Sequence, residues 1–402
     1  MKINYFITHF PYKNHVNEPK YFACYRCGGA ELTAYYLASE VAKRGHEVNV
    51  FTTSIDSRNS FEKYDHMNVY RYGTKLKIEN ANISFGLFTK PLSHDGDIVH
   101  AHFSTPPAEI AALWYAKKRK IPIVLTYHGD WQENFGRITR RMALHLYNRY
   151  LLDVILSSVD IIISPSQYYI YDSRFLSKYQ DKIIVIPNGI NIESFEVPYP
   201  KEECRRKLGL GINKNIILFV GNLIRYKGPD ILVRALSIVV KEIPNTELIF
   251  VGSGNMRNEL EELSKKLGTE KYVKFAGFVE EYLKPLYYKA ADVFCLPSIM
   301  STEVFPLVLL EAAASGLPIV VSDLNTFKCI IKDGYNGLFT KRGDAKSLAS
   351  AIIYLLENED VRRRMGENAR KNVENYSWNK ITEEYEEVYE RVLNENLSSR
   401  RI

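Results

Sequence analysis

Short apolar runs alternate with amphipathic segments over most of this chain, and this alternation restricts the fold more than any other feature. Short runs bounded by turn residues indicate buried strands, and longer segments with helical periodicity indicate helices. Strands are expected at 2–8, 47–52, 97–101, 122–127, 160–164, 182–186, 216–221, 247–252, 272–276, 292–296 and 318–322. Helices are expected at 29–44, 106–119, 138–157, 167–178, 228–242, 255–267, 280–290, 306–315 and 344–357. This order predicts an α/β protein whose parallel sheets are covered on both faces and joined by right-handed crossovers.

One segment, IPNGINIESFEVPYP at 186–200, interrupts the alternation. Its prolines and its Asn-Gly pair favour turns and extended backbone. The alternation then resumes, and 402 residues exceed the usual size of one domain. We therefore predict two α/β domains, at 1–190 and 191–375. The end of the chain reads as nearly continuous helix, and we expect residues 376–402 to pack back on the first domain.

Charge and hydropathy narrow the class of partner. The net charge of +6 suits anionic partners such as nucleotides, lipid phosphates or a membrane face, and it is too small and too dispersed to indicate DNA binding. The chain has no signal-peptide pattern and no apolar run of about 18 residues, so we expect a cytoplasmic protein. Cys24 and Cys27 form one C-x2-C pair without the second pair that a zinc site needs, so no metal is expected.

Two junctions between a strand and a helix carry residues that suit phosphate. Gly28 and Gly29, in CGGAEL, let the backbone approach an anion at a helix N-terminus, although a helix start that simply needs glycine explains them equally well. Arg225 and Lys227 lie in GNLIRYKGPDIL, just before an expected helix. Cations there oppose the helix dipole unless an anion is bound, so this loop is the stronger phosphate candidate.

Histidines follow two neighbouring strands. His128, in YHGD, stands at a strand end, where an imidazole can donate to a substrate oxygen, although a purely structural role is also common. In HAHFS, we expect His100 to be buried and His102 to be the one with access to a ligand. The Asp95-Gly96-Asp97 triplet has the pattern of a metal-dependent sugar transferase, but it precedes its strand and therefore faces away from the ligand-binding strand ends.

Two glutamates flank a predicted helix start in STEVFPLVLLEAAASGLPIVVSD at 301–323. Pro306 stands where a first helical residue is expected, since proline there loses no hydrogen bond. Glu311 would lie roughly 7 Å further along the axis, and Glu303 lies on the other side of the helix start. A phosphate at the N-terminus, with one carboxylate near a sugar and one near a ribose, is the functional interpretation. A helix with two ordinary glutamates is the alternative.

In combination, these residues resemble the retaining GT-B glycosyltransferases of glycosyltransferase family 4. The Glu-x7-Glu motif of the family is matched by Glu303 and Glu311, its Gly-Gly loop by GGAE, and its Lys-Gly loop by Lys227-Gly228. Further matching segments are IPNGINIESF, GFVEEYLKPLYYKAADVFCLPS, DGYNGLF and YSWNKITEEYEEVY. The resemblance extends over nearly the whole chain. It implies two Rossmann-like domains that face a central cleft, an acceptor-side domain at 1–190 and a donor-binding domain at 191–375.

The resemblance also implies roles for single residues. Glu311 would hold the ribose hydroxyls, Glu303 the donor sugar, and Lys227 the diphosphate. The backbone of the helix start would face the phosphate or sugar, and this part of the chain consists of Phe305, Pro306, Leu307 and Val308. His128 would contact the sugar near the reacting centre as a second catalytic residue beside Glu303, and Gly28 and Gly29 would line the donor site. No cofactor would be needed, because Lys227 and helix N-termini can take the charge of the leaving group.

Three positions depart from the family pattern, and the mildest is Asn191, which replaces the usual aspartate of the hinge pattern. Asn222 stands where the family often has arginine, and Arg225 would supply the missing charge. Val304 follows the first glutamate where glycine is usual, and valine disfavours a positive φ. The overall prediction is a hexosyltransferase that uses a UDP- or GDP-linked sugar and a glycan, lipid-linked or small-molecule acceptor. The alternatives are a nucleotide-sugar 2-epimerase and a non-catalytic sugar-nucleotide-binding protein. The loop 10–26 and the basic helix at 137–149 are candidates for peripheral membrane contact.

Overall fold

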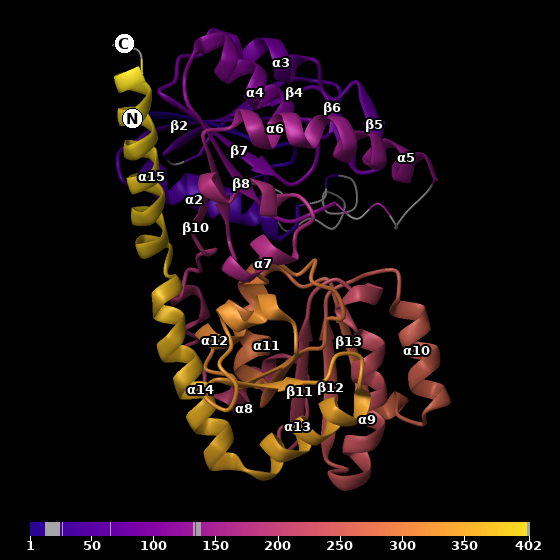
Figure 1. The fold of residues 1–402 in the computed structure, drawn as a ribbon. Helices are drawn as coiled ribbons and strands as arrows, with labels where there is room; N and C mark the ends of the chain where they lie inside the picture. The colour runs from indigo at the N-terminus through magenta and orange to yellow at the C-terminus, as the bar shows by residue number, and fades with distance from the viewer. Residues whose placement is uncertain (13–24, 26, 65, 132, 134–137, 400–402) are drawn as a thin grey trace. The chain divides into compact units, whose positions relative to one another are not determined.

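The computed structural model describes residues 1–12, 25, 27–64, 66–131, 133 and 138–399, and Figure 1 shows its elements. The chain forms two compact units, one of residues 1–189 and 378–402 and the other of residues 190–377. Each unit is an α/β layer structure with a sheet that is parallel or nearly so, so the predicted fold class is confirmed.

The first unit contains a sheet in the order β10-β9-β8-β7-β1-β2-β4-β3. All neighbouring pairs in it are parallel except β3–β4, which is antiparallel. Its strands are β1 (Lys2–Phe6), β2 (Glu47–Thr53), β3 (Ser60–Lys63), β4 (Met67–Tyr72), β7 (Ile98–Phe103), β8 (Ile123–Tyr127), β9 (Ile161–Ser164) and β10 (Ile183–Val185). A separate hairpin consists of β5 (Leu76–Ile78) and β6 (Ala81–Ile83).

Helices cover both faces of this sheet. They are α2 (Gly29–Lys43), α3 (Gly86–Thr89), α4 (Ala108–Arg119), α5 (Ile138–Leu146), α6 (Leu152–Ser158), α7 (Gln167–Asp172) and α15 (Trp378–Ser399). Short 3-10 turns lie at Lys90–Ser93, Leu176–Lys178 and Gln180–Lys182. Successive side chains of a strand point to opposite faces. Tyr5 of β1 therefore packs in the core with α2 and α15, while the ring of Phe6 lies 5.4 Å from that of Tyr115 on α4.

The C-terminal helix α15 is an integral part of the first unit. Its buried residues Ile381, Tyr385, Tyr389 and Val392 join the core formed by β1, β2 and α2. At its start, the Trp378 ring lies so close to Gly189 that a Cβ there would come within 2.4 Å of it. The apolar positions recur with helical spacing, so one face of α15 is buried while the other carries the charged residues.

The second unit contains a fully parallel sheet in the order β13-β12-β11-β14-β15-β16. Its strands are β11 (Asn215–Val220), β12 (Thr246–Val251), β13 (Val273–Gly277), β14 (Val293–Leu296), β15 (Ile319–Ser322) and β16 (Gly337–Thr340). Most of their residues are aliphatic or aromatic and buried, as expected for strands covered on both faces.

Helices again cover the sheet of the second unit. They are α8 (Lys201–Lys207), α9 (Pro229–Glu242), α10 (Arg257–Lys266), α11 (Lys284–Ala290), α12 (Leu307–Ala314), α13 (Ala345–Glu357) and α14 (Glu359–Val373). Short 3-10 turns lie at Glu193–Phe195, Arg225–Lys227, Glu270–Tyr272, Glu281–Leu283, Asn325–Cys329 and Glu374–Tyr376. Helix α9 packs against α13, α11 against α8, and α12 against α14.

Two expected helices differ in detail from the structure. The single helix expected at 138–157 is α5, a π-helical turn at Tyr147–Leu151 and then α6. The helix expected at 167–178 ends at Asp172. The hydroxyl of Ser173 accepts hydrogen bonds from the N–H groups of Phe175 and Leu176, and this local bonding stops the helical pattern. None of the helices in the described ranges is both long and apolar enough to cross a membrane.

Candidate active site

The strand order of the second unit reverses between β11 and β14. Strands β12 and β13 extend the sheet to one side of β11, and β14 to β16 extend it to the other. Loops that leave two such strands separate and open a crevice beyond their carboxyl ends, which is where ligands bind in open α/β sheets. The two loops at this point are residues 221–228, after β11, and residues 297–306, after β14. Both contain residues predicted to bind the donor.

An ion pair joins these two loops. Lys227 Nζ lies 2.7 Å from Glu303 Oε1, and both side chains are about one-tenth exposed. Nearby, the N–H of Ile299 donates to the carbonyl of Tyr226 at 2.7 Å. Burial, with a smaller contribution from the charge of Glu303, raises the pKa of Tyr226. The structure therefore brings together two of the predicted residues, Lys227 and Glu303, in one partly desolvated place.

Gly228 explains how Lys227 reaches this position. Its φ is +68°, in the left-handed region, and a Cβ there would lie 2.2 Å from the carbonyl oxygen of Pro297. Only glycine fits both conditions. It allows the chain to turn directly from the loop into α9 while the loop after β14 passes close by.

The start of α12 differs from the expectation by one residue. Pro306 is the N-cap, with extended backbone at φ −74° and ψ 118°, and the helix begins at Leu307. The prediction of Pro306 as the first helical residue is therefore wrong, and since proline lacks an N–H it cannot donate to a phosphate. The free N–H groups of this helix start are those of Leu307 and Val308, while Leu309 N–H donates back to Pro306.

Val304 fits its place without backbone strain. Among the described non-glycine residues, only Glu79 and Lys120 have positive φ. Val304 and Phe305 are both buried, at 4% and 5% exposure. A glycine is therefore not required after Glu303 in this chain, because an apolar side chain packs where the family pattern has none.

Glu311 is the fifth residue of α12 and is also buried, at 9% exposure. Tyr288 donates its hydroxyl to Glu311 Oε2 at 2.6 Å, and Lys284 Nζ lies 3.8 Å from Oε1. Burial, followed by the charge of Glu311, raises the pKa of Tyr288 far above its usual value. Lys284 and Tyr288 were not predicted as site residues. Their spacing of four on α11 was the available signal, because it places both on one helix face.

Arg225 has a different environment from Lys227. Its side chain is largely exposed, and its guanidinium donates to both carboxylate oxygens of Glu259 on α10, at 2.7 and 3.0 Å. Asp230 lies 3.9 Å away. In this arrangement its charge is already paired at the surface, whereas Lys227 is paired inside the site.

In the first unit, Gly28 and Gly29 form the start of α2. Gly28 is the N-cap, and its N–H donates to Glu31 Oε2 at 2.7 Å. Its φ of −109° is open to any residue, so the backbone conformation does not require glycine. The Glu31 side chain is buried, which raises its pKa. The helix N-terminus thus already has a carboxylate beside it, which makes this loop a poorer phosphate site than the sequence suggested.

His128 follows β8 and is part of a stack of histidines. Its Nε2 lies 3.0 Å from Nδ1 of His102, and the ring of His102 lies 4.4 Å from that of His100. Burial lowers the pKa of His128 and of His100 to about 3, and that of His102 well below its usual value. All three rings are therefore neutral near pH 7. The expectation that His102 has access to a ligand is wrong, because His102 is fully buried beneath His128.

The hydrogen-bond pattern assigns the proton positions in this stack. Within the described residues, His102 Nε2 is buried without a partner. A buried lone pair is tolerated better than a buried N–H without an acceptor, so the proton of His102 belongs on Nδ1 and is donated to His128 Nε2. His128 then carries its own proton on Nδ1. This nitrogen can donate to a substrate oxygen, but a neutral imidazole with this low pKa is not a general acid.

A buried polar network supports the stack from below. His100 Nδ1 lies 2.7 Å from the hydroxyl of Tyr389 on α15, and Tyr389 in turn lies 2.9 Å from the hydroxyl of Tyr5. The other nitrogen of His100 lies 2.8 Å from Thr126 Oγ1. His100 is thus a satisfied core histidine, as predicted, and it connects the C-terminal helix with the strand that positions His128.

Asp130 fixes the loop that contains His128. Its carboxylate accepts from the hydroxyls of Tyr127 and Ser173, at 2.8 and 2.6 Å, and from the N–H of Arg174 at 3.0 Å. These contacts tie the end of β8 to the segment after α7. The position of His128 is therefore set by bonds on either side of it, and Asp130 has a structural function.

The remaining candidates fall outside the site. Asp97 accepts from the N–H of Lys2 at 2.7 Å, and Asp95 pairs with Arg119 at 3.1 Å, so both carboxylates have partners within the first unit. Cys24 and most of the loop 10–26 lie outside the described residues, and Cys27 is a free thiol. In the part of the chain that the structure describes, no three His, Cys, Asp or Glu side chains gather as metal ligands would.

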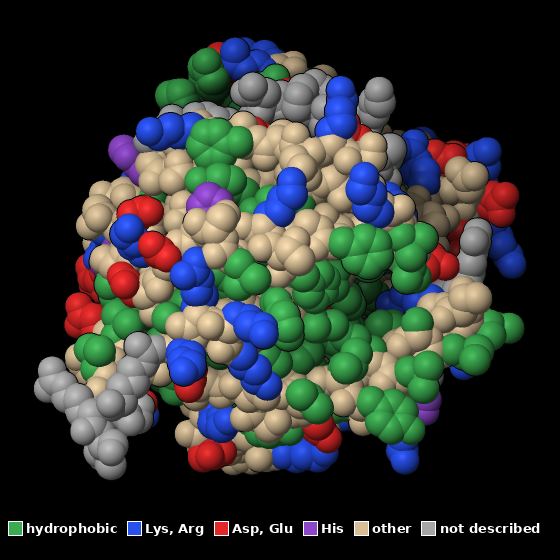
Figure 2. Space-filling view, turned by 90° about the horizontal axis from the view of Figure 1, so that it is seen from above, with side chains coloured by type: hydrophobic (Ala, Val, Ile, Leu, Met, Phe, Trp, Pro, Cys, Tyr) green, Lys and Arg blue, Asp and Glu red, His purple; other side chains and the backbone are tan. Residues whose placement is uncertain are grey.

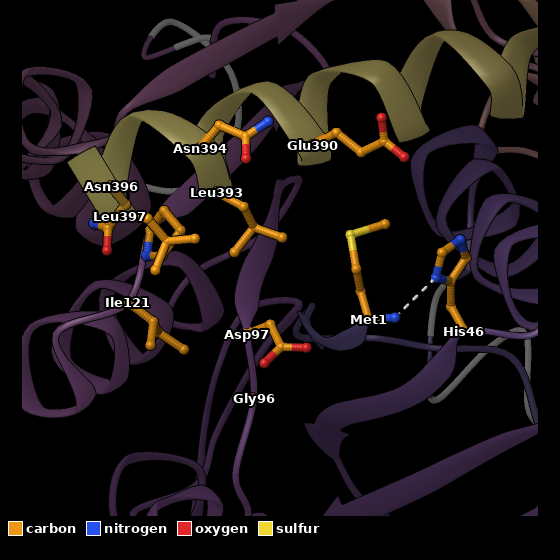
Figure 3. A pocket seen from close by; sticks show the side chains of 11 residues that line it. Met1, His46, Gly96, Asp97, Ile121, Glu390, Leu393, Asn394, Asn396 and Leu397 are labelled. Atoms are coloured by element: carbon orange, nitrogen blue, oxygen red, sulfur yellow. Dashed lines mark hydrogen bonds between the residues drawn. The ribbon is translucent and has the colours of Figure 1, made fainter.

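A pocket of about 670 Å³ lies in the first unit, at the end of the sheet where the parallel strands begin (Figure 3). Met1, His46, Asp97 and Pro122, which line it, precede strands rather than follow them, and Glu390 and Leu393 of α15 close one side. Because ligands of parallel sheets bind at the carboxyl ends of strands, we do not place the sugar chemistry there.

Comparison with known protein families finds a glycosyltransferase family in each of the two units. Residues 27–194 match the family described as Glycosyltransferase Family 4, and residues 200–372 match the family described as Glycosyl transferases group 1. These two segments contain every predicted site residue.

Individual relatives and structures align over nearly the full chain. An uncharacterized glycosyltransferase of Methanocaldococcus jannaschii is 31% identical, over 90% of this chain and 94% of its own. A phosphatidyl-myo-inositol mannosyltransferase of Mycobacterium leprae is 28% identical, over 91% and 93%. The crystal structure of Anabaena HepE in complex with UDP and glucose superposes with a TM-score of 0.73 at 22% identity, over 96% and 99%.

Proposed function

The chain belongs to glycosyltransferase family 4, and from this premise we propose that it transfers a hexose from a UDP- or GDP-linked sugar with retention of anomeric configuration and without a metal ion. As a member of this family it is a GT-B glycosyltransferase that uses a nucleotide sugar and a lipid or glycan acceptor. The finer statement, of hexose, base, stereochemistry and metal independence, is our proposal.

The observation that carries the proposal is the grouping of Lys227, Glu303 and Glu311 around one strand-order reversal. A nucleotide diphosphate sugar needs a cation for its phosphates and acceptors for its two sets of hydroxyls. Lys227 supplies the cation, and the N–H groups of Leu307 and Val308 add donors at a helix N-terminus. Glu311 is proposed to accept from the ribose and Glu303 from the donor sugar.

Departure of the diphosphate requires stabilisation of the charge that develops on it. Lys227 and the start of α12 are preorganised to provide this in a partly desolvated place. This chemistry needs no divalent cation, which supports metal independence. Arg225 lies in the same loop but is bound to Glu259, so we propose for it only a secondary attraction of the anionic donor.

In the first unit, His128 is proposed to donate a hydrogen bond from Nδ1 to an oxygen of the sugar near the reacting centre. Its neutrality follows from burial, and its proton position from the bond with His102. We propose Gly28 and Gly29 as residues that leave space for substrate rather than as a phosphate cradle, because Glu31 occupies the helix start. The lipid acceptor of the mycobacterial relative is consistent with a lipid-linked acceptor here.

The proposal is tested by separating donor binding from transfer. Calorimetric titration of UDP-, GDP- and ADP-sugars identifies the donor, because the correct base should give the lowest Kd. Glu311→Ala should weaken nucleotide binding, while Glu303→Ala should abolish transfer with a smaller loss of nucleotide affinity. Unchanged transfer in both variants would refute the assignment. Incubation of the donor without acceptor should yield slow hydrolysis at most, and an epimerised donor would instead indicate the epimerase reaction.

A further inference from the structure

One side of the segment α5–α6 exposes a row of large apolar side chains. Ile138, Met142, Leu146, Tyr150 and Val154 recur every four residues and are 72%, 62%, 55%, 61% and 50% exposed. Leu151 beside them is 44% exposed. We refer to these six residues as the α5–α6 stripe. Isolated exposed apolar residues are ordinary, but a contiguous row of this length marks an interaction site.

The π-helical turn keeps the stripe on one side of the segment. At 3.6 residues per turn, each step of four residues drifts by about 40° around an α-helix, so four steps would spread the row by about 160°. A π-turn closes its hydrogen bonds from i to i+5 and holds more residues per turn, so the step across Tyr147–Leu151 removes part of that drift. The irregular turn thereby aligns the apolar residues of α5 with those of α6.

The opposite side of the segment is anchored in the first unit. Tyr147 is buried, donates its hydroxyl to the buried carboxylate of Glu109 on α4, and packs its ring 4.7 Å from Trp131. Leu152, Ile155 and Leu156 are buried as well. By contrast, α5 buries none of its own side chains. The stripe is therefore presented on a firmly attached support, and the apolar residues of α5 do not belong to the core.

The charges within the segment are mainly positive. Arg140, Arg141 and Arg149 stand against a single acidic residue, Asp153, which has Lys178 within 3.3 Å. The guanidinium of Arg149 lies 5.7 Å from the ring of Tyr150. Figure 2, which looks onto the first unit, shows hydrophobic side chains gathered in the lower right part of this face, with Lys and Arg side chains among them. Apolar residues on one side with arginines beside them are the pattern of a helix that lies in a lipid headgroup region.

We propose that the α5–α6 stripe docks the protein on an anionic lipid surface. The apolar side chains would enter the boundary between headgroups and acyl chains, and Arg141 and Arg149 would pair with lipid phosphates. A protein partner would need a shaped surface with complementary charge, whereas a bilayer accepts a long straight row of Ile, Met, Leu, Tyr and Val side chains without one. This goes beyond the proposed transfer reaction, since it concerns where the enzyme works rather than what it does.

Vesicle flotation tests the proposal. The wild-type protein should float with vesicles of phosphatidylcholine containing about one-third phosphatidylglycerol, and binding should be weak with phosphatidylcholine alone and should fall as salt rises. Met142→Glu with Leu146→Glu should reduce vesicle binding by at least about tenfold, because two apolar insertions are lost and two like charges are added. Arg141→Gln with Arg149→Gln should reduce only the part of the binding that depends on phosphatidylglycerol.

A matched control is available in the same unit. Phe61→Glu with Phe85→Glu changes two apolar residues of similar exposure, 56% and 68%, outside the stripe, and should leave flotation unchanged. Nucleotide binding by calorimetry should be unchanged in all of these variants, which separates this proposal from the proposed function. Equal flotation of the stripe variant and the wild type would overturn it. So would a lipid-free dimer in analytical ultracentrifugation that the stripe variant converts to a monomer, because the occupant would then be a second copy.

Discussion

Lys227 and Glu303 are far apart in the sequence, yet their side chains form a 2.7 Å ion pair where the strand order of the second unit reverses. The pair connects the loop after β11 with the loop after β14. Both charged groups are largely removed from water, so each relies on the opposite charge of the other to offset the cost of its burial. In the proposed assignment, a diphosphate that takes over Lys227 would leave Glu303 free to accept from sugar hydroxyls, and phosphate binding would then be coupled to sugar binding.

The first prediction concerns the stability of this pair. Lys227→Ala leaves the Glu303 carboxylate uncompensated and should lower the free energy of unfolding of the second unit by about 3 kcal/mol. Lys227→Met combined with Glu303→Gln removes both charges and should recover most of that loss. Urea unfolding at pH 7 measures both. A double variant as unstable as the single one would show that the ion pair is not the cause.

The second prediction concerns Tyr288, which the sequence did not reveal as a site residue. Tyr288→Phe keeps the ring but removes the 2.6 Å hydrogen bond to Glu311, so the carboxylate is held less firmly. Nucleotide affinity should fall by at least about tenfold, since hydrogen bonds to charged groups contribute about 1.5–3 kcal/mol and each 1.4 kcal/mol is about a factor of ten. Calorimetry with the preferred nucleotide checks this. Tyr354→Phe, at an exposed position on α13, is the control and should bind normally.

The third prediction concerns the proton position on His128. If His102 donates to His128 Nε2, nitrogen-15 chemical shifts should show a proton on Nδ1 of His128 and none on Nε2. His102→Leu should lose this preference and reduce kcat by up to about tenfold with little change in nucleotide affinity. His102→Asn returns a donor near the same place and should restore part of kcat. A proton found on Nε2 of wild-type His128 would contradict the assignment.

The fourth prediction follows from the low pKa of buried His100, about 3 in the folded protein against 6.5 for an ordinary histidine. Burial, and then the nearby His128, lowers it. Between these two values the unfolded chain binds more protons than the folded chain, so stability must fall as the pH falls below 6.5. Each pH unit costs about 1.4 kcal/mol per such histidine.

Urea midpoints at pH 7, 6 and 5 should therefore decrease in the wild-type protein. His100→Gln should show a smaller decrease, because glutamine does not titrate. An equal slope in the variant would mean that His100 does not remain neutral in the folded state. His46, which is partly exposed on the same unit, offers a matched control as His46→Gln.

The fifth prediction concerns Gly228. Gly228→Ala forces a positive φ on alanine and places its Cβ 2.2 Å from the Pro297 carbonyl. It should cost about 3 kcal/mol or more and weaken nucleotide binding through displacement of Lys227. Gly268 has nearly the same φ, +66°, with open space around its Cβ position. Gly268→Ala should therefore cost only about 1 kcal/mol. If both variants lose the same stability in thermal unfolding, the positive φ alone causes the loss and the contact with Pro297 contributes nothing.

The local pattern of apolar and polar residues was sufficient to locate most helices and strands, but it did not reveal several short or irregular ones. The central strands are continuous aliphatic runs, so the sequence located them within a residue or two. Strands β3, β4, β5, β6 and β16 were missed. Four of them are only three or four residues long, and β4 (MNVYRY) has polar residues between its apolar ones instead of a continuous apolar run. The π-turn at Tyr147–Leu151 was missed because its anchor, the buried Glu109, lies on another helix.

The sequence by itself determined the α/β class, the family, the position of Lys227, Glu303 and His128 at strand-to-helix junctions, and that of Glu311 inside the helix after one of them, because periodicity and turn chemistry are local properties. Only the tertiary structure decided which of these residues meet. It paired Lys227 with Glu303, held Glu311 by Tyr288, bound Arg225 to Glu259, and buried His102 beneath His128. These outcomes depend on the order of strands in a sheet and on which helix faces pack together, and those contacts join residues that no local pattern in the chain relates to one another.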